Sequence, residues 1–166
     1  MIFVCAMTMA QTNAYPLLPM PQNYKVTDKS FAMGKVKLST PVLKSEWEAF
    51  IVNAGGELAD KAAAEIKIEL LPVIDGVKLN PDEAYRLSVS GKLIKIEAVT
   101  ERGVYWALQT LRQLEKKKGK KSLFAGCEIV DWPAFRIRGF MQDVGRSYIS
   151  VEELKREIEI LSRFKI

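Results

Sequence analysis

The chain has 166 residues, of which 48% are apolar and 27% charged, and its formal net charge is +5 at pH 7. This length and balance fit one globular domain with its own core and exclude a collagen-like or mucin-like chain. Because the sequence contains no histidine, histidine-dependent triads, histidine metal sites and imidazole pH switches are excluded as well. The two cysteines provide neither a disulfide framework nor a zinc site. We expect no metal ion and no cofactor.

The N-terminus has the pattern of a secretory signal peptide. Residues 2–10 are apolar apart from Thr8, and small residues stand at two possible cleavage points that follow, although the usual basic start is missing. We therefore expect residues 1–14 to be a signal peptide and the protein to be secreted or periplasmic. A buried N-terminal strand is the alternative, and Cys5 could carry a lipid anchor. No stretch of the sequence is long enough to span a membrane.

Alternating apolar and polar residues predict several β-strands. The clearest are the arms of a β-hairpin, Tyr85–Val89 and Leu93–Val99, joined by a Ser-Gly-Lys turn. The alternation also predicts a strand at 64–71, and Cys127 is expected to be a buried free thiol in another. Further strands or extended pieces are expected at Asn23–Val26, Lys35–Ser39, Cys127–Val130 and Ile137–Gln142.

Apolar residues spaced i, i+3 and i+4 predict three amphipathic helices. Ser45 should cap the first, and Gly55-Gly56 should end it. The second should run from about Glu101 to Lys117, with its lysines complementing the helix dipole. The third should begin with a capping box at Ser150 and still be running at Ile166. A run of lysines is expected to form a solvated helix end or loop rather than a nucleic-acid surface: Lys116, Lys117, Lys118, Lys120 and Lys121.

Three stretches, in this order and spacing, carry a family resemblance. Residues 18–22 read Leu-Pro-Met-Pro-Gln, residues 83–114 combine the hairpin with the second helix, and residues 129–166 contain Asp-Trp-Pro-Ala-Phe, Arg-Gly and a later aspartate and arginine. Together they resemble family 20 glycoside hydrolases, the β-N-acetylhexosaminidases. The second stretch is similar to the non-catalytic domain that precedes the family's barrel, and the third looks like the start of that barrel. The resemblance runs from about Pro16 to Ile166.

Pattern and resemblance together predict an α+β fold in two parts. Residues 15–130 should form a mostly antiparallel sheet with two helices on one face. Residues 131–166 should be the first β/α unit of a TIM barrel. Because a single strand and helix cannot bury both faces of the strand, we expect more protein to follow Ile166.

The resemblance implies release of terminal N-acetylhexosamines from glycans by retaining, substrate-assisted hydrolysis, an exception to the usual two-carboxylate scheme. The family's paired aspartate and glutamate, in a His-x-Gly-Gly-Asp-Glu motif, lie beyond the first barrel unit. We therefore assign no catalytic residue in this chain and expect it to be inactive alone. Its partners would be the glycan and the rest of the barrel in cis, with no nucleic acid and no membrane span.

Three residues match the family near the substrate. Arg138 matches an arginine that contacts hydroxyls of the terminal sugar, a task that suits the fixed donors of a guanidinium. An ion pair with Asp143 is the alternative role for Arg138. Asp143 and Arg146 are expected to pair and fix the loop after the first barrel strand. The tryptophans, Trp132 at the domain junction included, are expected to pack rather than bind sugar.

Two other functions stay open. The chain could be a stand-alone module that binds a glycan or a protein. It could also be the preceding domain of another barrel glycosidase, such as an α-glucuronidase.

Overall fold

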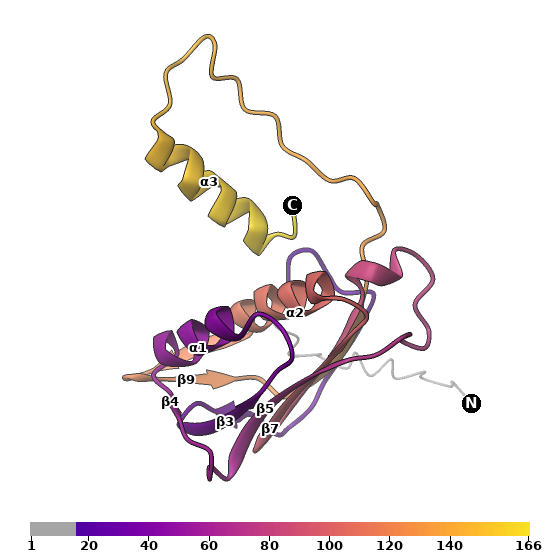
Figure 1. Ribbon diagram of the computed structural model, residues 1–166, viewed down its shortest axis with the longest axis vertical. Helices are drawn as coiled ribbons and strands as arrows, with labels where there is room; N and C mark the ends of the chain where they lie inside the picture. The colour runs from indigo at the N-terminus through magenta and orange to yellow at the C-terminus, as the bar shows by residue number, and fades with distance from the viewer. Residues whose placement is uncertain (1–15) are drawn as a thin grey trace, which may run out of the picture.

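The computed structural model describes residues 16–166, which form a sheet covered by two helices and an arm that carries a third helix (Figure 1). The expected signal peptide at 1–14, with Cys5, lies outside the described residues. No helix in the described part of the chain is long and apolar enough to cross a membrane.

Seven strands form the main sheet, in the order β1-β10-β6-β7-β5-β3-β4. They are β1 (Asn23–Val26), β3 (Lys35–Ser39), β4 (Glu57–Leu58), β5 (Ala64–Leu70), β6 (Tyr85–Ser90), β7 (Leu93–Ala98) and β10 (Cys127–Asp131). A smaller sheet joins β2 (Phe31–Ala32), β9 (Lys121–Phe124) and β8 (Glu115–Lys118).

The main sheet is mixed, so the expectation of a mostly antiparallel sheet is wrong. Strands β1, β10, β6 and β7 pair antiparallel, whereas β7–β5, β5–β3 and β3–β4 pair in parallel. The cause lies in the connections. Helix α1 (Lys44–Asn53) crosses over between β3 and β4 and returns the chain in the same direction, as parallel strands require. Alternation of residues reports a half-buried strand but not the direction of its neighbour.

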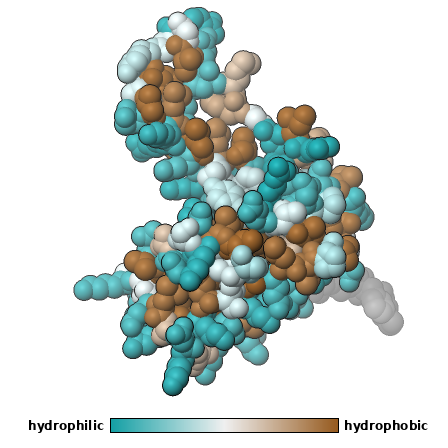
Figure 2. All heavy atoms as spheres, viewed as in Figure 1, coloured by the Kyte–Doolittle hydropathy of each residue, from teal (hydrophilic) through white to brown (hydrophobic). Residues whose placement is uncertain are grey.

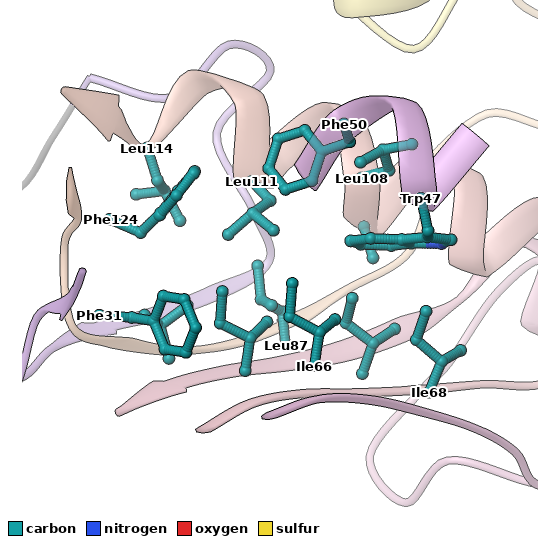
Figure 3. Packing of buried hydrophobic residues seen from close by; sticks show 14 of the residues in the cluster. Phe31, Trp47, Phe50, Ile66, Ile68, Leu87, Leu108, Leu111, Leu114 and Phe124 are labelled. Atoms are coloured by element: carbon teal, nitrogen blue, oxygen red, sulfur yellow. The ribbon is translucent and has the colours of Figure 1, made fainter. Parts of the chain in front are cut away.

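Helices α1 and α2 (Glu101–Gln113) lie on one face of the main sheet and close the hydrophobic core (Figure 1). Figure 3 shows Trp47 and Phe50 of α1 and Leu108 of α2 pointing toward Ile66 and Leu87 of the sheet. All five are at most 3% exposed. Full burial of an apolar side chain of this size contributes about 1.5–3 kcal/mol.

Helix α1 begins differently from the expectation. Its N-cap is Leu43, in the left-handed conformation with φ 53°, and no side chain caps it. Ser45 lies inside the first turn, where its hydroxyl donates to Glu46 Oε2 at 2.9 Å. Past the other end, Gly55 has φ +77°, the left-handed geometry that ends many helices.

Helix α2 ends four residues earlier than expected, and the lysine run forms a hairpin instead of a helix end. Lys116–Lys118 belong to β8, which pairs with β9 around a turn at Gly119 (φ +64°). The reason is non-local, because buried Ser122 and Phe124 give β9 one inward face and β8 completes its pairing. The lysines are exposed on this hairpin.

The arm, residues 133–166, contains α3 (Val151–Arg163) but no strand. The strand or extended piece expected at Ile137–Gln142 is extended chain, with no described strand beside it to pair with. The capping box at Ser150 is confirmed, since Ser150 and Glu153 bond reciprocally. The helix ends at Arg163, before Ile166.

Candidate functional site at the end of the sheet

The arm meets the α+β domain at a group of polar and aromatic side chains that we call the junction cluster. Its members are Glu83, Tyr85, Trp106, Asp131, Arg138 and Lys165. They line a cavity of about 270 Å³, together with apolar residues that include Pro19, Trp132 and Phe135. Glu83, Tyr85 and Asp131 lie at one end of β6 and β10, because Asp131 pairs directly with Tyr85 in the sheet.

Lys165 forms the buried half of this cluster with Asp131 and Tyr85. Its Nζ donates to Asp131 Oδ2 at 2.7 Å and to the Tyr85 hydroxyl at 2.9 Å. The Tyr85 hydroxyl also bonds to Thr110 of α2 at 2.6 Å and lies 3.1 Å from Asp131 Oδ2. The side chains of Lys165 and Asp131 are each only 9% exposed. Each charge is therefore paired inside the protein, as buried charges must be.

Arg138 forms the other half of the cluster with Glu83. Its Nη2 donates to Glu83 Oε2 at 2.5 Å, its Nη1 to Phe135 O at 2.7 Å and its Nε to Lys165 O at 2.7 Å. Trp106 Nε1 donates to the same Glu83 oxygen at 2.8 Å, and the Arg138 guanidinium lies 5.6 Å from the Trp106 ring centroid. All three guanidinium nitrogens thus have partners within the protein.

Lys165 reaches the cluster from a left-handed backbone position just past the end of α3. Its φ is +62°, its N–H donates to Ser162 O, and Ile166 N–H donates to Leu161 O. This is the Schellman arrangement, in which the left-handed position is usually glycine. A lysine there carries a backbone penalty of about 1–2 kcal/mol. The Lys165–Asp131 ion pair thus forms although the backbone of Lys165 is in an unfavourable conformation.

Burial and the ion pairs shift the pKa values of two groups in the cluster. Burial lowers the pKa of Lys165, while the adjacent Asp131 carboxylate opposes the shift. Burial, with the nearby Asp131 charge, raises the pKa of Tyr85 well above its ordinary value, so this hydroxyl stays protonated. The carboxylates of Glu83 and Asp131 are occupied by cations. The cluster thus consists of two ion pairs, each joining an acid of the α+β domain to a cation of the arm.

The other site residues predicted from sequence lie apart from the cluster. Asp143 and Arg146 form an ion pair on the arm, and the Arg146 side chain is 89% exposed. The hydrogen bond from Arg146, with those from the Gly145 and Arg146 amides, lowers the pKa of Asp143. The ion-pair partner of Arg138 is Glu83 and not Asp143. The structure brings Asp143 and Arg146 together but leaves both away from Arg138.

Two further residues considered from the sequence are buried. Trp132 is 8% exposed and packs with Ile74 and Ala84. Cys127 is a buried free thiol in β10, and burial raises its pKa to about 12. Among residues 16–166 no three histidine, cysteine or carboxylate side chains gather as a metal site would require.

A larger hollow of about 640 Å³ lies between α1, α2 and the end of α3, lined by side chains of both charges.

Comparison with known proteins assigns the family. Residues 14–132 match the family profile described as glycosyl hydrolase family 20, domain 2. The chain belongs to glycosyl hydrolase family 20. This confirms the family resemblance carried by residues 18–22 and 83–114.

Several family 20 proteins are similar to this chain. A β-hexosaminidase of Porphyromonas gingivalis is 30% identical over 166 residues, covering 90% of this chain and 21% of the relative. A β-hexosaminidase of Vibrio furnissii is 35% identical over 106 residues, covering 64% of this chain and 16% of the relative. The chain therefore spans about a fifth of the length of these curated relatives.

A solved family 20 structure has the same fold over most of the chain. It is an inactive mutant of an exo-β-N-acetylglucosaminidase from Vibrio harveyi, 33% identical with a TM-score of 0.74. The match covers 92% of this chain and 24% of that one.

Sequence reasoning missed Glu83, Tyr85, Asp131 and Lys165 as partners in one cluster. The partners are far apart in sequence, 55 residues for Glu83 and Arg138 and 34 for Asp131 and Lys165. No helix or strand period links such positions. The available signal is weak: a lysine near the end of a predicted amphipathic helix, and two acids next to predicted strands.

Proposed function

We propose that this chain is the non-catalytic domain and the first barrel strand and helix of a β-N-acetylhexosaminidase. The observation that carries the proposal is the 30% identity to a β-hexosaminidase over 90% of the chain. An alignment of that extent reaches past the domain match at 14–132 and into residues 133–166. The whole enzyme would remove terminal N-acetylhexosamines from glycans, and the rest of the barrel would be its partner in cis.

The exposed apolar residues of the arm support this assignment. Phe135 is 74% exposed, Ile137 90%, Met141 91% and Ile158 66%. Figure 2 shows hydrophobic side chains at the surface of the upper part of the molecule, where Figure 1 places α3. Soluble proteins rarely leave so many large apolar side chains uncovered. A strand and helix that pack against neighbouring barrel units would bury them.

In the proposed reaction the 2-acetamido oxygen of the sugar attacks its own anomeric carbon. A glutamate protonates the leaving oxygen, and a neighbouring aspartate orients the acetamido group. Such an acid needs a raised pKa and an open path to substrate. Both buried carboxylates of the junction cluster are bound to cations, which supports placing this chemistry elsewhere in the enzyme.

The roles of Arg138, Asp143 and Arg146 in that enzyme stay predictions. Three hydrogen bonds to protein atoms engage the Arg138 guanidinium, which favours the structural alternative over the sugar contact. We propose that Asp143 and Arg146 fix the loop after the first barrel strand. We also propose export of the enzyme, on the signal-like pattern of residues 1–14.

Two measurements test the proposal: the DNA sequence that follows the codon for Ile166, and an assay of hexosaminidase activity. Reading the gene past the codon for Ile166 should reveal a frame that continues into His-x-Gly-Gly-Asp-Glu. The longer protein should release nitrophenol from 4-nitrophenyl N-acetyl-β-D-glucosaminide, and purified residues 1–166 should not. Turnover by pure 1–166, or a stop codon directly after Ile166, would contradict the proposal, and the stop codon would favour a binding module.

A further inference from the structure

Apolar burial does not explain how the arm is held on the α+β domain. Helix α3 contains no buried residue, and its Val151, Ile158 and Ile160 are 43–66% exposed. The extended chain before it is also largely exposed. Figure 1 shows α3 standing off from α1 and α2 at the end of a long connection. Something other than a shared core fixes its position.

Polar contacts link the arm to the domain, and the most buried of them converge on the junction cluster. Arg138 bonds to Glu83, and Lys165 bonds to Asp131 and Tyr85. Outside the cluster, Gln113 Nε2 donates to Arg163 O at 2.8 Å, and Asn80 Nδ2 donates to Pro133 O at 2.7 Å. Both ends of the arm are thus tied to one end of the sheet.

We infer that the junction cluster is a docking site in which Glu83 and Asp131 of the α+β domain hold the arm through Arg138 and Lys165. The domain presents the acids and the arm presents the cations, so the pairing is complementary in charge. Arg138 also donates to the Lys165 carbonyl, which couples the two contacts. Lys165 is the principal anchor, since its side chain is 9% exposed against 21% for Arg138.

The chemistry of buried ion pairs makes this dock sensitive to single substitutions. A buried charge that loses its partner is strongly unfavourable, whereas replacing both partners by neutral groups is far milder. The backbone conformation of Lys165 also supports its role as an anchor. The left-handed position favours glycine, but only a long cationic side chain reaches Asp131.

The dock has a consequence for the proposed enzyme, and this step alone rests on the proposed function. Arg138 stands near the start, and Lys165 just past the end, of the segment that we propose as the first barrel strand and helix. The dock therefore sets how the barrel sits on the α+β domain. Glu83 and Asp131 become positioning residues for the barrel rather than catalytic residues.

Nuclear magnetic resonance relaxation of the 1–166 chain tests the dock without any substrate. In the wild-type chain, amide order parameters in α3 should match those of the sheet, near 0.85. In Lys165→Met they should fall below about 0.6, while β5, β6 and β7 keep their order parameters. The matched control is Lys155→Met, on the exposed part of the same helix, which should change nothing.

Two further variants keep the test decisive. Lys165→Met with Asp131→Asn leaves no unpaired charge in the pocket, so the domain stays folded and α3 is still released. Arg138→Met should loosen the arm less than Lys165→Met, and Arg136→Met, two residues away and exposed, should not. Order parameters near 0.85 in α3 of the double variant, or low values already in the wild type, would overturn the inference. Neither result depends on hexosaminidase activity.

Discussion

The α+β domain and the arm use the same kinds of residues in opposite ways. In the domain, isoleucines such as Ile66, Ile94 and Ile96 are fully buried between the sheet and two helices. In the arm, Ile137 and Ile158 are 90% and 66% exposed, and the buried side chain is a lysine. The domain closes its own core, while the arm is attached through charges.

This difference shows that an element can form locally without being stabilised by its own packing. Helix α3 has a capping box and a Schellman end, so local signals alone define its limits. Helix α2 has a capping Thr100 as well, but its inward face also packs on the sheet. Most helical stability in proteins comes from such packing. We expect substitutions to expose the contrast.

The largest contrast is expected from the same isoleucine substitution in each region. Ile96→Ala in β7 leaves a cavity in a closed core and should lower the free energy of unfolding by about 2–5 kcal/mol. Ile158→Ala in α3 removes a side chain that is 66% exposed and should change it by less than about 0.5 kcal/mol. Urea unfolding followed by circular dichroism measures both. Equal losses would show that the arm has a core of its own.

A smaller contrast is expected from adding one methyl group. Gly103 lets α2 approach the sheet, because a Cβ there would lie 2.2 Å from Ala84 O and 3.0 Å from Ala98 Cβ. Gly103→Ala should destabilise the domain by about 1–3 kcal/mol despite the better helix propensity of alanine. Gly139→Ala on the arm meets nothing within 4 Å and should be neutral. If both changes were neutral in thermal unfolding, the close packing of α2 on the sheet would be wrong.

The smallest effect is a pH dependence confined to the domain core. The pKa of the buried Cys127 thiol is about 12 in the folded chain, against 9.0 for an ordinary thiol. Above pH 9 the unfolded chain therefore loses this proton before the folded chain does. The free energy of unfolding should fall as the pH rises from 9 toward 12, by about 1.4 kcal/mol from this group at pH 10.

The variant Cys127→Ala isolates that contribution from other groups. Its loss of stability between pH 8 and pH 10 should be smaller than that of the wild type by the same amount. Identical pH profiles would mean that the thiol is not buried in the folded chain.

The sequence anticipated what depends on local pattern and missed what depends on distant partners. The hairpin of β6 and β7 and the start of α2 at Glu101 are confirmed, because alternation, a Gly-containing turn and a cap mark them locally. The predicted end of α2 at Lys117 is wrong, because the lysines that suit a helix terminus belong to strand β8, which pairs with β9. The parallel half of the sheet was missed because strand direction depends on crossovers.

The same limit applies to the site. Arg138 was singled out through a family resemblance, but its bond to Glu83 joins residues far apart in the chain. Lys165 is an unremarkable lysine in the sequence, and only the fold places it against Asp131. Ionic contacts of this kind follow from the tertiary arrangement rather than from residue spacing.

Native-state hydrogen exchange of the 1–166 chain tests the contrast between the two regions most directly. We expect amides of β5, β6, β7 and α2 to exchange only through global unfolding. Amides of α3, docked at its end but unburied along its length, should exchange through local opening that requires about 3 kcal/mol less, roughly a hundredfold faster. Protection of α3 equal to that of β7 would contradict our conclusion that charges, and not a shared core, hold the arm.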